Sequence, residues 1–113
     1  MSTPGTVPTA TLSTHVLDSV LGRPAPGMTV VLTDPGGFDV AEGVTDPDGR
    51  IRFAEPVAAG SHRLTFATGP WFAAAGRETF YPVAIVAFTV AAGEHHHVAL
   101  LLGPWSYTTY RGS

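Results

Sequence analysis

The chain has 113 residues and a net charge of −3, with 44% hydrophobic and 13% charged residues, which suits one folded domain and excludes a disordered protein. It contains no cysteine, and its six basic residues are all arginines, so thiol nucleophiles, disulfides, thiolate metal sites and Schiff-base lysines are excluded. No basic run is present, so we expect no nucleic-acid partner.

The first ten residues are polar and carry Pro4 and Pro8. They lack the charged and apolar regions of a secretory signal, so we expect a cytoplasmic protein. Composition predicts a flexible tail over residues 1–10 and a single domain over residues 11–113. The longest apolar stretch, Val83 to Ala92, is too short to span a bilayer, so we expect no membrane role.

Ten prolines and thirteen glycines divide the chain into short segments, as is typical of strands. Alternating or β-branched patterns predict eight strands, over residues 11–18, 28–33, 38–45, 51–53, 61–68, 81–90, 95–102 and 106–110. Residues 22–27 read as a loop. One short helix is predicted within residues 69–76, where Trp71 and Phe72 precede three alanines. Many short strands with turns between them favour an all-β sandwich or a small barrel.

Side chains alternate between the two faces of a strand, so each strand has a predicted core face and outer face. In the first strand the core face holds Leu12, Thr14 and Val16, and the outer face holds Ser13, His15 and Leu17. In residues 95–102 the core face holds His96, Val98, Leu100 and Leu102, and the outer face holds His95, His97, Ala99 and Leu101. The outer face combines histidines with apolar side chains, which suggests that a second protomer covers it.

The three consecutive histidines allow more than one interpretation. His95 and His97 share one face, a spacing that lets two imidazoles reach one metal ion. Zinc would need a third ligand, and the nearest acid, Glu94, is predicted to face the other way. Solvated histidines without function are one alternative, and acid–base work in a covered cleft is another. We assign no metal ligand.

Arg50 follows the turn sequence Asp46-Pro47-Asp48-Gly49. Such an arginine can lie in solvent, or its guanidinium can bind a planar anionic or carbonyl-rich ligand. The segment Tyr110–Ser113 reads from composition as a frayed end. Asp18 stands three residues after His15 and therefore on the opposite face of the strand, so a turn or cap role is expected for it.

Three segments resemble the motifs of the 5-hydroxyisourate hydrolases, the transthyretin-like enzymes of urate breakdown. Leu12–Asp18 resembles their N-terminal signature, and His95–Pro104 resembles their penultimate strand. Tyr110–Ser113 matches their C-terminal tetrapeptide Y-R-G-S in full. Asp46–Arg50 and Phe80–Pro82 also stand where that family has them. Transthyretin itself keeps the fold but lacks the histidines and the Y-R-G-S end.

The resemblance implies a transthyretin-like β-sandwich of two four-stranded sheets with one short helix. It implies a homotetramer whose central channel holds the active sites, and hydrolysis of 5-hydroxyisourate to 2-oxo-4-hydroxy-4-carboxy-5-ureidoimidazoline without a cofactor. The family's functional residues fall on His15, Arg50, His97 and Tyr110, with Ser113 as a further candidate. We expect His97, with His15, to activate water and Arg50 to stabilise the oxyanion, while His15, Arg50, Tyr110 and Ser113 bind substrate. A non-catalytic transthyretin-like tetramer that binds a small ligand is the alternative.

The chain departs from the family pattern at three positions. His96 stands where the family prefers Tyr, Ala99 replaces the usual Pro, and Gly103 replaces the usual Ser. His96 is predicted to point away from the channel. These departures therefore concern local strand geometry rather than the reaction.

Overall fold

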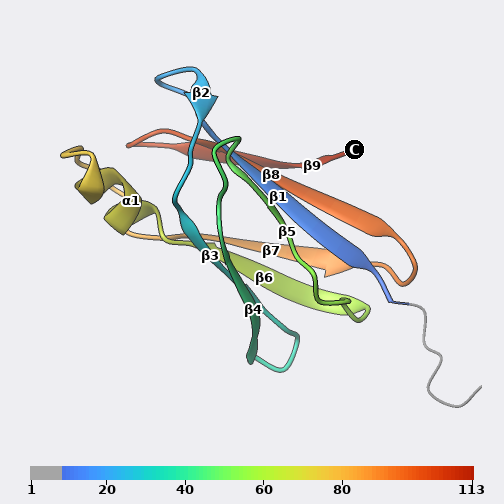
Figure 1. Ribbon diagram of the computed structural model, residues 1–113. Helices are drawn as coiled ribbons and strands as arrows, with labels where there is room; N and C mark the ends of the chain where they lie inside the picture. The colour runs from blue at the N-terminus through green and yellow to red at the C-terminus, as the bar shows by residue number, and fades with distance from the viewer. Residues whose placement is uncertain (1–8) are drawn as a thin grey trace, which may run out of the picture.

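The computed structural model describes residues 9–113, which fold into two facing β-sheets with a short helix at one end (Figure 1). The elements in chain order are β1 (Thr11–Asp18), β2 (Arg23–Pro24), β3 (Thr29–Thr33), β4 (Asp39–Val44), β5 (Arg50–Arg52), β6 (Gly60–Phe66), α1 (Thr68–Ala74), β7 (Ala84–Val90), β8 (His95–Leu102) and β9 (Tyr107–Gly112). The predicted all-β sandwich with one short helix is confirmed.

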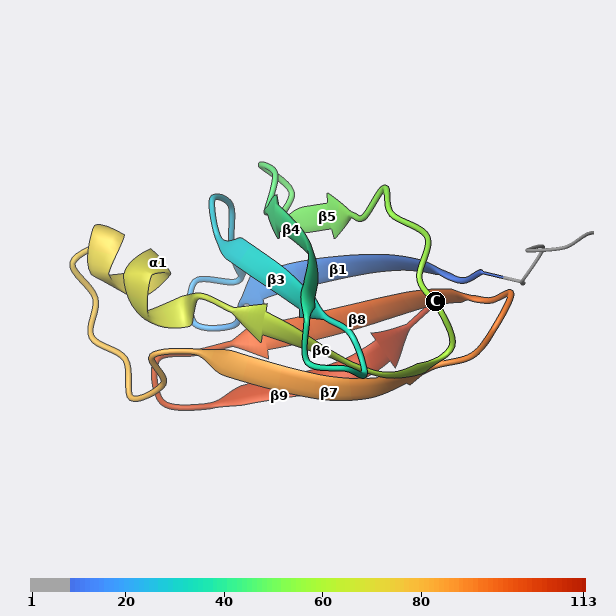
Figure 2. The same cartoon turned by 90° about the horizontal axis from the view of Figure 1, so that it is seen from below.

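The first sheet has the strand order β2-β1-β8-β9, with β5 also paired to β1, and the second has the order β4-β3-β6-β7. Figure 2 shows the two layers from below. In the first sheet β1 and β8 run parallel, and the other pairs are antiparallel. Since β2 pairs with the end of β1 and β5 with its middle, these two short strands share one side of β1.

The first sheet has five strands rather than the predicted four. The additional strand, β2, has only two residues, Arg23 and Pro24, and lies where the sequence predicts a loop. Two residues are too few to show an alternating pattern. They become a strand only because they pair with Leu17 and Asp18 of β1.

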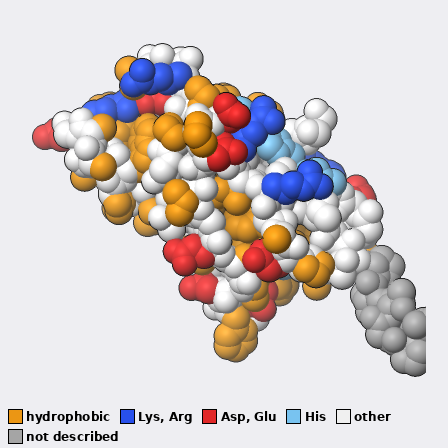
Figure 3. All heavy atoms as spheres, in the orientation of Figure 1, with side chains coloured by type: hydrophobic (Ala, Val, Ile, Leu, Met, Phe, Trp, Pro, Cys, Tyr) orange, Lys and Arg blue, Asp and Glu red, His pale blue; other side chains and the backbone are white. Residues whose placement is uncertain are grey.

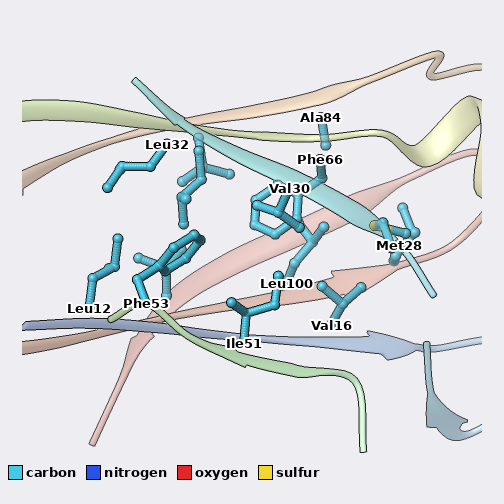
Figure 4. Packing of buried hydrophobic residues seen from close by; sticks show 14 of the residues in the cluster. Leu12, Val16, Met28, Val30, Leu32, Ile51, Phe53, Phe66, Ala84 and Leu100 are labelled. Carbon is cyan, nitrogen blue, oxygen red and sulfur yellow. The ribbon is translucent and has the colours of Figure 1, made fainter. Parts of the chain in front are cut away.

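The hydrophobic core lies between the two sheets (Figure 4). The predicted core faces of β1 and β8 are confirmed, since Leu12, Val16 and Leu100 are fully buried. Val30 and Phe66 contribute from the second sheet. Full burial of one such side chain stabilises the fold by about 1.5–3 kcal/mol. Packing of the core faces therefore fixes which side chains of β1 and β8 point outward.

The strand predicted over residues 81–90 begins later, at Ala84. Tyr81 and Pro82 lie beside the start of α1 instead. The Tyr81 carbonyl accepts a hydrogen bond of 2.7 Å from the Thr68 hydroxyl, and the Pro82 carbonyl accepts one of 2.9 Å from the Gly69 amide. These hydrogen bonds hold residues 81 and 82 beside α1, so they do not join the sheet.

The end of the chain is paired rather than frayed. β9 continues past the predicted boundary at Tyr110 and includes Arg111 and Gly112, which pair with Val98 and His97 of β8. The prediction of a frayed end is therefore wrong for these residues. Pairing with β8 is a long-range contact that composition does not reveal.

Ala10, the last residue of the predicted tail, belongs to the folded domain. Residues 1–8 lie outside the described range, but Ala10 is only 1% exposed. Its amide and carbonyl exchange hydrogen bonds of 2.8 and 2.9 Å with Val57. Ala10 is thus part of the folded domain. Across residues 9–113 the structure holds no helix with the length and hydropathy needed to cross a bilayer.

Candidate active site

The outer face of the first sheet brings the predicted site residues into rows. Arg50 on β5 pairs with His15 on β1, His15 pairs with Ala99 on β8, and Ala99 pairs with Tyr110 on β9. Paired residues on neighbouring strands project from the same face of a sheet. Arg50, His15 and Tyr110 therefore lie in one row, with the small Ala99 between the last two.

A second row lies two residues further along. Arg52 on β5 pairs with Ser13 on β1, Ser13 pairs with His97 on β8, and His97 pairs with Gly112 on β9. The two rows meet at the imidazoles of His15 and His97, whose ring centroids are 6.3 Å apart with an interplanar angle of 47°. Figure 3 shows pale-blue histidine side chains beside blue arginine side chains on this part of the surface.

Small residues in the rows leave space above the sheet. A depression of about 560 Å³ is lined by Ser13, Arg50, Arg52, His97, Tyr110 and Ser113, among others. His15 borders a neighbouring depression, to which Arg50 also belongs. Arg50 thus lines both depressions. Tyr110 is 51% exposed, and Ser113 lies just beyond the end of β9.

The turn before β5 fixes the position of Arg50. One carboxylate oxygen of Asp46 accepts hydrogen bonds of 2.9 Å from the amides of Asp48 and Arg50. Gly49 adopts a positive φ of 75°, and its carbonyl accepts a bond of 2.8 Å from the Val16 amide. A side chain at position 49 would also collide with the Val16 carbonyl. The turn sequence therefore holds the arginine against the middle of β1.

Hydroxyl groups of β1 hold the two outward histidines of β8. Ser13 Oγ lies 2.7 Å from His97 Nδ1 and 2.9 Å from His95 Nε2. Thr11 Oγ1 lies 2.6 Å from His95 Nδ1. Since Nδ1 of His97 is engaged by Ser13, Nε2 is the ring nitrogen of His97 that is left for a ligand.

The surroundings of His97 favour its neutral form. Burial lowers the pKa of this imidazole, and the positive charges of His15, Arg50 and His95 lower the pKa further. The pKa therefore lies below the ordinary histidine value of 6.5. A neutral imidazole at neutral pH has a lone pair with which to accept a proton.

His96 and Asp18 do not enter this face. His96 is 3% exposed and points into the core, where its Nε2 accepts a hydrogen bond of 3.0 Å from the Ala91 amide. Asp18 has the predicted turn role, since its carboxylate accepts bonds from the amides of Val20 and Leu21 and pairs with Arg77 at 2.6 Å. Within residues 9–113, histidine, aspartate and glutamate nowhere gather in a group of three that could hold a metal ion.

Three residues of this face are not identified as site residues from the sequence. Alternation alone places Ser13 beside His15 and Arg52 beside Arg50, so the signal for both was present. Gly112 gives no such signal. Its place opposite His97 follows only from the register between β8 and β9.

Two 5-hydroxyisourate hydrolases are similar to this chain over most of its length. The 5-hydroxyisourate hydrolase of Salmonella dublin is 44% identical over 109 residues, which cover 90% of this chain and 80% of the relative. The structure of Klebsiella pneumoniae 5-hydroxyisourate hydrolase matches with a TM-score of 0.85 and 45% identity, over 92% of this chain and 94% of the other.

Transthyretin is similar as well. The structure of transthyretin from Sparus aurata matches with a TM-score of 0.80 and 33% identity, over 89% of this chain and 95% of the other. The model of the HIUase/Transthyretin family matches residues 12–112, which is nearly the whole described range. The chain therefore belongs to the HIUase/Transthyretin family.

Proposed function

We propose that this protein hydrolyses 5-hydroxyisourate to 2-oxo-4-hydroxy-4-carboxy-5-ureidoimidazoline in urate degradation. The proposal is supported by relatives named as 5-hydroxyisourate hydrolases at 38–44% identity. The observation that carries it is the placement of His15 beside both His97 and Arg50 on one face of the sheet, at two neighbouring depressions that share Arg50. No cofactor takes part in the proposed reaction.

His97 acts as the base that activates water. His97 lines the depression, and its lowered pKa favours the neutral imidazole at pH 7. His15 stands beside it, with ring centroids 6.3 Å apart, so the two imidazoles can hold one water molecule between them. A positioned acid–base group contributes about 10²- to 10⁴-fold to a rate.

Arg50 stabilises the negative charge that develops on the substrate. Attack of water on a carbonyl carbon creates an oxyanion, and a fixed cationic donor lowers the energy of that state. The planar guanidinium can also bind two carbonyl oxygens of a flat ring at once. The hydrogen bond from its backbone amide to Asp46 holds the backbone of Arg50 in place before substrate arrives.

Tyr110 and Ser113 bind the substrate from the β9 side of the depression. Tyr110 stands across Ala99 from His15, and both β9-side residues line the depression. The tyrosine ring can stack on a flat heterocycle, and both hydroxyls can donate hydrogen bonds to its carbonyl oxygens.

The active form is a homotetramer whose central channel encloses these sites. In a single chain the depression lies open, with Tyr110 half exposed and Leu17 and Leu101 only partly covered. A face that combines histidines, arginines and leucines is suited to burial against another copy. Exclusion of bulk water would strengthen the action of Arg50 on the substrate.

The experiment generates 5-hydroxyisourate in situ from urate and follows the decay of its near-UV absorbance with and without the protein. The proposal expects a decay that is faster in proportion to protein concentration. A non-catalytic transthyretin-like binding protein, the alternative, would leave the decay at its uncatalysed rate or slow it by sequestering the compound. Either of the last two results would reject the hydrolase proposal.

A further inference from the structure

A continuous line of hydrogen bonds runs from the depression to the exposed first residues of β1 and β8. It links His97 Nδ1 to Ser13 Oγ at 2.7 Å, Ser13 Oγ to His95 Nε2 at 2.9 Å, and His95 Nδ1 to Thr11 Oγ1 at 2.6 Å. His97 is partly buried at one end, and His95 is exposed at the other. The proposed hydrolysis uses only the His97 end of this line.

The chemistry of one hydroxyl group sets the direction of the line. Ser13 has one hydroxyl proton and two acceptor lone pairs and lies between two imidazole nitrogens, so it donates to at most one of them. If Ser13 donated to His97 Nδ1, the proton of neutral His97 would sit on Nε2, and the imidazole would have no lone pair toward the depression. A base at Nε2 therefore requires that His97 Nδ1–H donates to Ser13 Oγ.

The rest of the line follows from this choice. Ser13 then has its own proton free, and it donates this proton to His95 Nε2 in the arrangement that links the two rings, with that nitrogen unprotonated. Neutral His95 consequently carries its proton on Nδ1 and donates it to Thr11 Oγ1. All three hydrogen bonds thus run from the depression toward solvent.

We propose that Ser13 and His95 form a proton relay that fixes the tautomer of His97 and carries a proton between the depression and solvent. This inference rests on the proposed hydrolysis. Ser13 is a positioning residue, since it acts on the reaction only through His97. His95 is the group at which the relayed proton reaches solvent.

Each transfer in the relay conserves protons. When His97 Nε2 takes a proton from water, one water O–H bond breaks and an Nε2–H bond forms. The Nδ1 proton of His97 then moves to Ser13 Oγ while the Ser13 hydroxyl proton moves to His95 Nε2. His97 is neutral again, and the His95 imidazolium releases a proton to solvent. The reverse sequence returns a proton as His97 Nε2–H protonates the leaving nitrogen.

The charges around the line favour movement of the proton outward. His15 on β1 and Arg50 on β5 face His97, and both oppose a positive charge on its ring. Near His95, Arg111 of β9 hydrogen bonds to the His95 carbonyl at 3.3 Å but also pairs with Glu94 at 3.3 Å. The positive charge of Arg111 is thus partly balanced, and water can solvate the exposed His95 imidazolium.

The kinetic test uses the full chain with Ser13→Ala, Ser13→Thr and His95→Gln. We expect Ser13→Ala to lower kcat by about 10- to 100-fold with little change in KM, and Ser13→Thr, which keeps a hydroxyl, to restore most of the loss. Ser61→Ala on the exposed face of β6 is the matched control and should keep the wild-type rate. An unchanged kcat in Ser13→Ala would overturn the proposal.

His95→Gln separates proton transfer from simple positioning. The glutamine carbonyl can still accept a hydrogen bond from Ser13, but it cannot take up a proton at neutral pH. We expect kcat to fall by about tenfold and to recover when imidazole is added to the buffer, since imidazole can take over the transfer. A wild-type kcat in His95→Gln would show that His95 carries no proton.

Nitrogen-15 NMR of the histidine rings provides a readout that does not depend on hydrolysis. In the wild-type protein with neutral rings, we expect His97 to be protonated on Nδ1 and not on Nε2, and Ser13→Ala to lose this preference. Protonation of wild-type His97 on Nε2 would contradict the relay. If the wild-type chain did not hydrolyse 5-hydroxyisourate, the proposed function would fail, while the NMR spectrum would still decide the direction of the hydrogen bonds.

Discussion

Gly112 lies directly opposite His97 in the β8–β9 ladder, and the imidazole ring occupies the space in which a side chain at position 112 would stand. A Cβ atom there would collide with His97 Cδ2 and would also lie 3.3 Å from His97 Cγ. The φ angle of Gly112 is not positive, so the glycine is required for space rather than for its backbone conformation. The imidazole ring of His97, the proposed base, therefore packs directly against the backbone of Gly112 in β9.

Gly112→Ala should displace the His97 ring and slow the reaction. A shift of about 1 Å in a catalytic group can cost about 100-fold in rate, and we expect a loss of at least tenfold in kcat. Gly103→Ala is the matched control, because a Cβ there meets its nearest neighbour, the Ser106 carbonyl, at an ordinary 3.4 Å. Equal rates for Gly112→Ala and the wild type would show that the position of the ring does not matter.

The alternation of β1 and β8 predicts which side chains enter the core, and the structure confirms it. Leu12 and Val16 are buried, while Ser13 and His15 face outward. These predictions succeed because a strand with one buried face must repeat every two residues. The same rule predicts that His96 points into the core, away from the outer face that holds His95 and His97, and the structure confirms it.

Other features depend on contacts that no local pattern encodes. The pairing of Arg111 and Gly112 with β8 joins polar residues without periodicity. The late start of β7 results from hydrogen bonds that Tyr81 and Pro82 make at the start of α1. The role of Ser13 between two imidazoles also requires the parallel register of β1 and β8. In each case the deciding partner is remote in sequence.

Arg50→Lys should lower kcat/KM by at least about tenfold, although the charge is kept. A lysine ammonium is a point charge and cannot reproduce the planar two-pronged geometry of the guanidinium. Arg63→Lys, at an exposed position of β6 in the other sheet, is the control and should leave the rate unchanged. The same steady-state assay serves both variants. A wild-type kcat/KM for Arg50→Lys would contradict a role of the guanidinium in the reaction and would make Arg50 an ordinary surface residue.

The acid limb of the pH–rate profile should lie below pH 6.5. The base must be neutral to accept a proton, and activity is lost as pH falls through the pKa of His97 in the folded protein. Burial and the charges of His15, Arg50 and His95 hold that pKa below its ordinary value. The measurement is kcat/KM as a function of pH, which reports groups of the free enzyme. A limb centred above 6.5 would contradict the assignment.

Arg77→Gln should destabilise the fold by about 1.5–3 kcal/mol at neutral pH, because it removes a charged hydrogen bond from Asp18, whose side chain is 1% exposed. Burial alone would raise the pKa of Asp18, but hydrogen bonds from Arg77 and from the amides of Leu21 and Val20 outweigh it and lower the pKa. The stabilisation is therefore present above pH 3.8 and is lost as pH falls through the lower, folded-state pKa.

Urea unfolding at neutral pH and below pH 3.8 measures how much Arg77→Gln lowers the free energy of unfolding at each pH. Arg23→Gln, at an exposed position of β2, is the control. The difference in the free energy of unfolding between Arg77→Gln and the wild type should be smaller in acid. An equal difference in unfolding free energy at both pH values would mean that the ion pair with Asp18 does not cause the destabilisation.

The most direct measurement compares the decay of 5-hydroxyisourate with equal concentrations of the wild type and His97→Asn. Asparagine is polar but cannot take a proton from water, and His97 lies outside the core, so the fold and the oligomeric state should be kept. We predict that the wild type accelerates the decay and that His97→Asn lowers the enzymatic rate by at least about 100-fold. Equal rates for the two proteins would contradict the account, because hydrolysis would then proceed without the imidazole on which it is built.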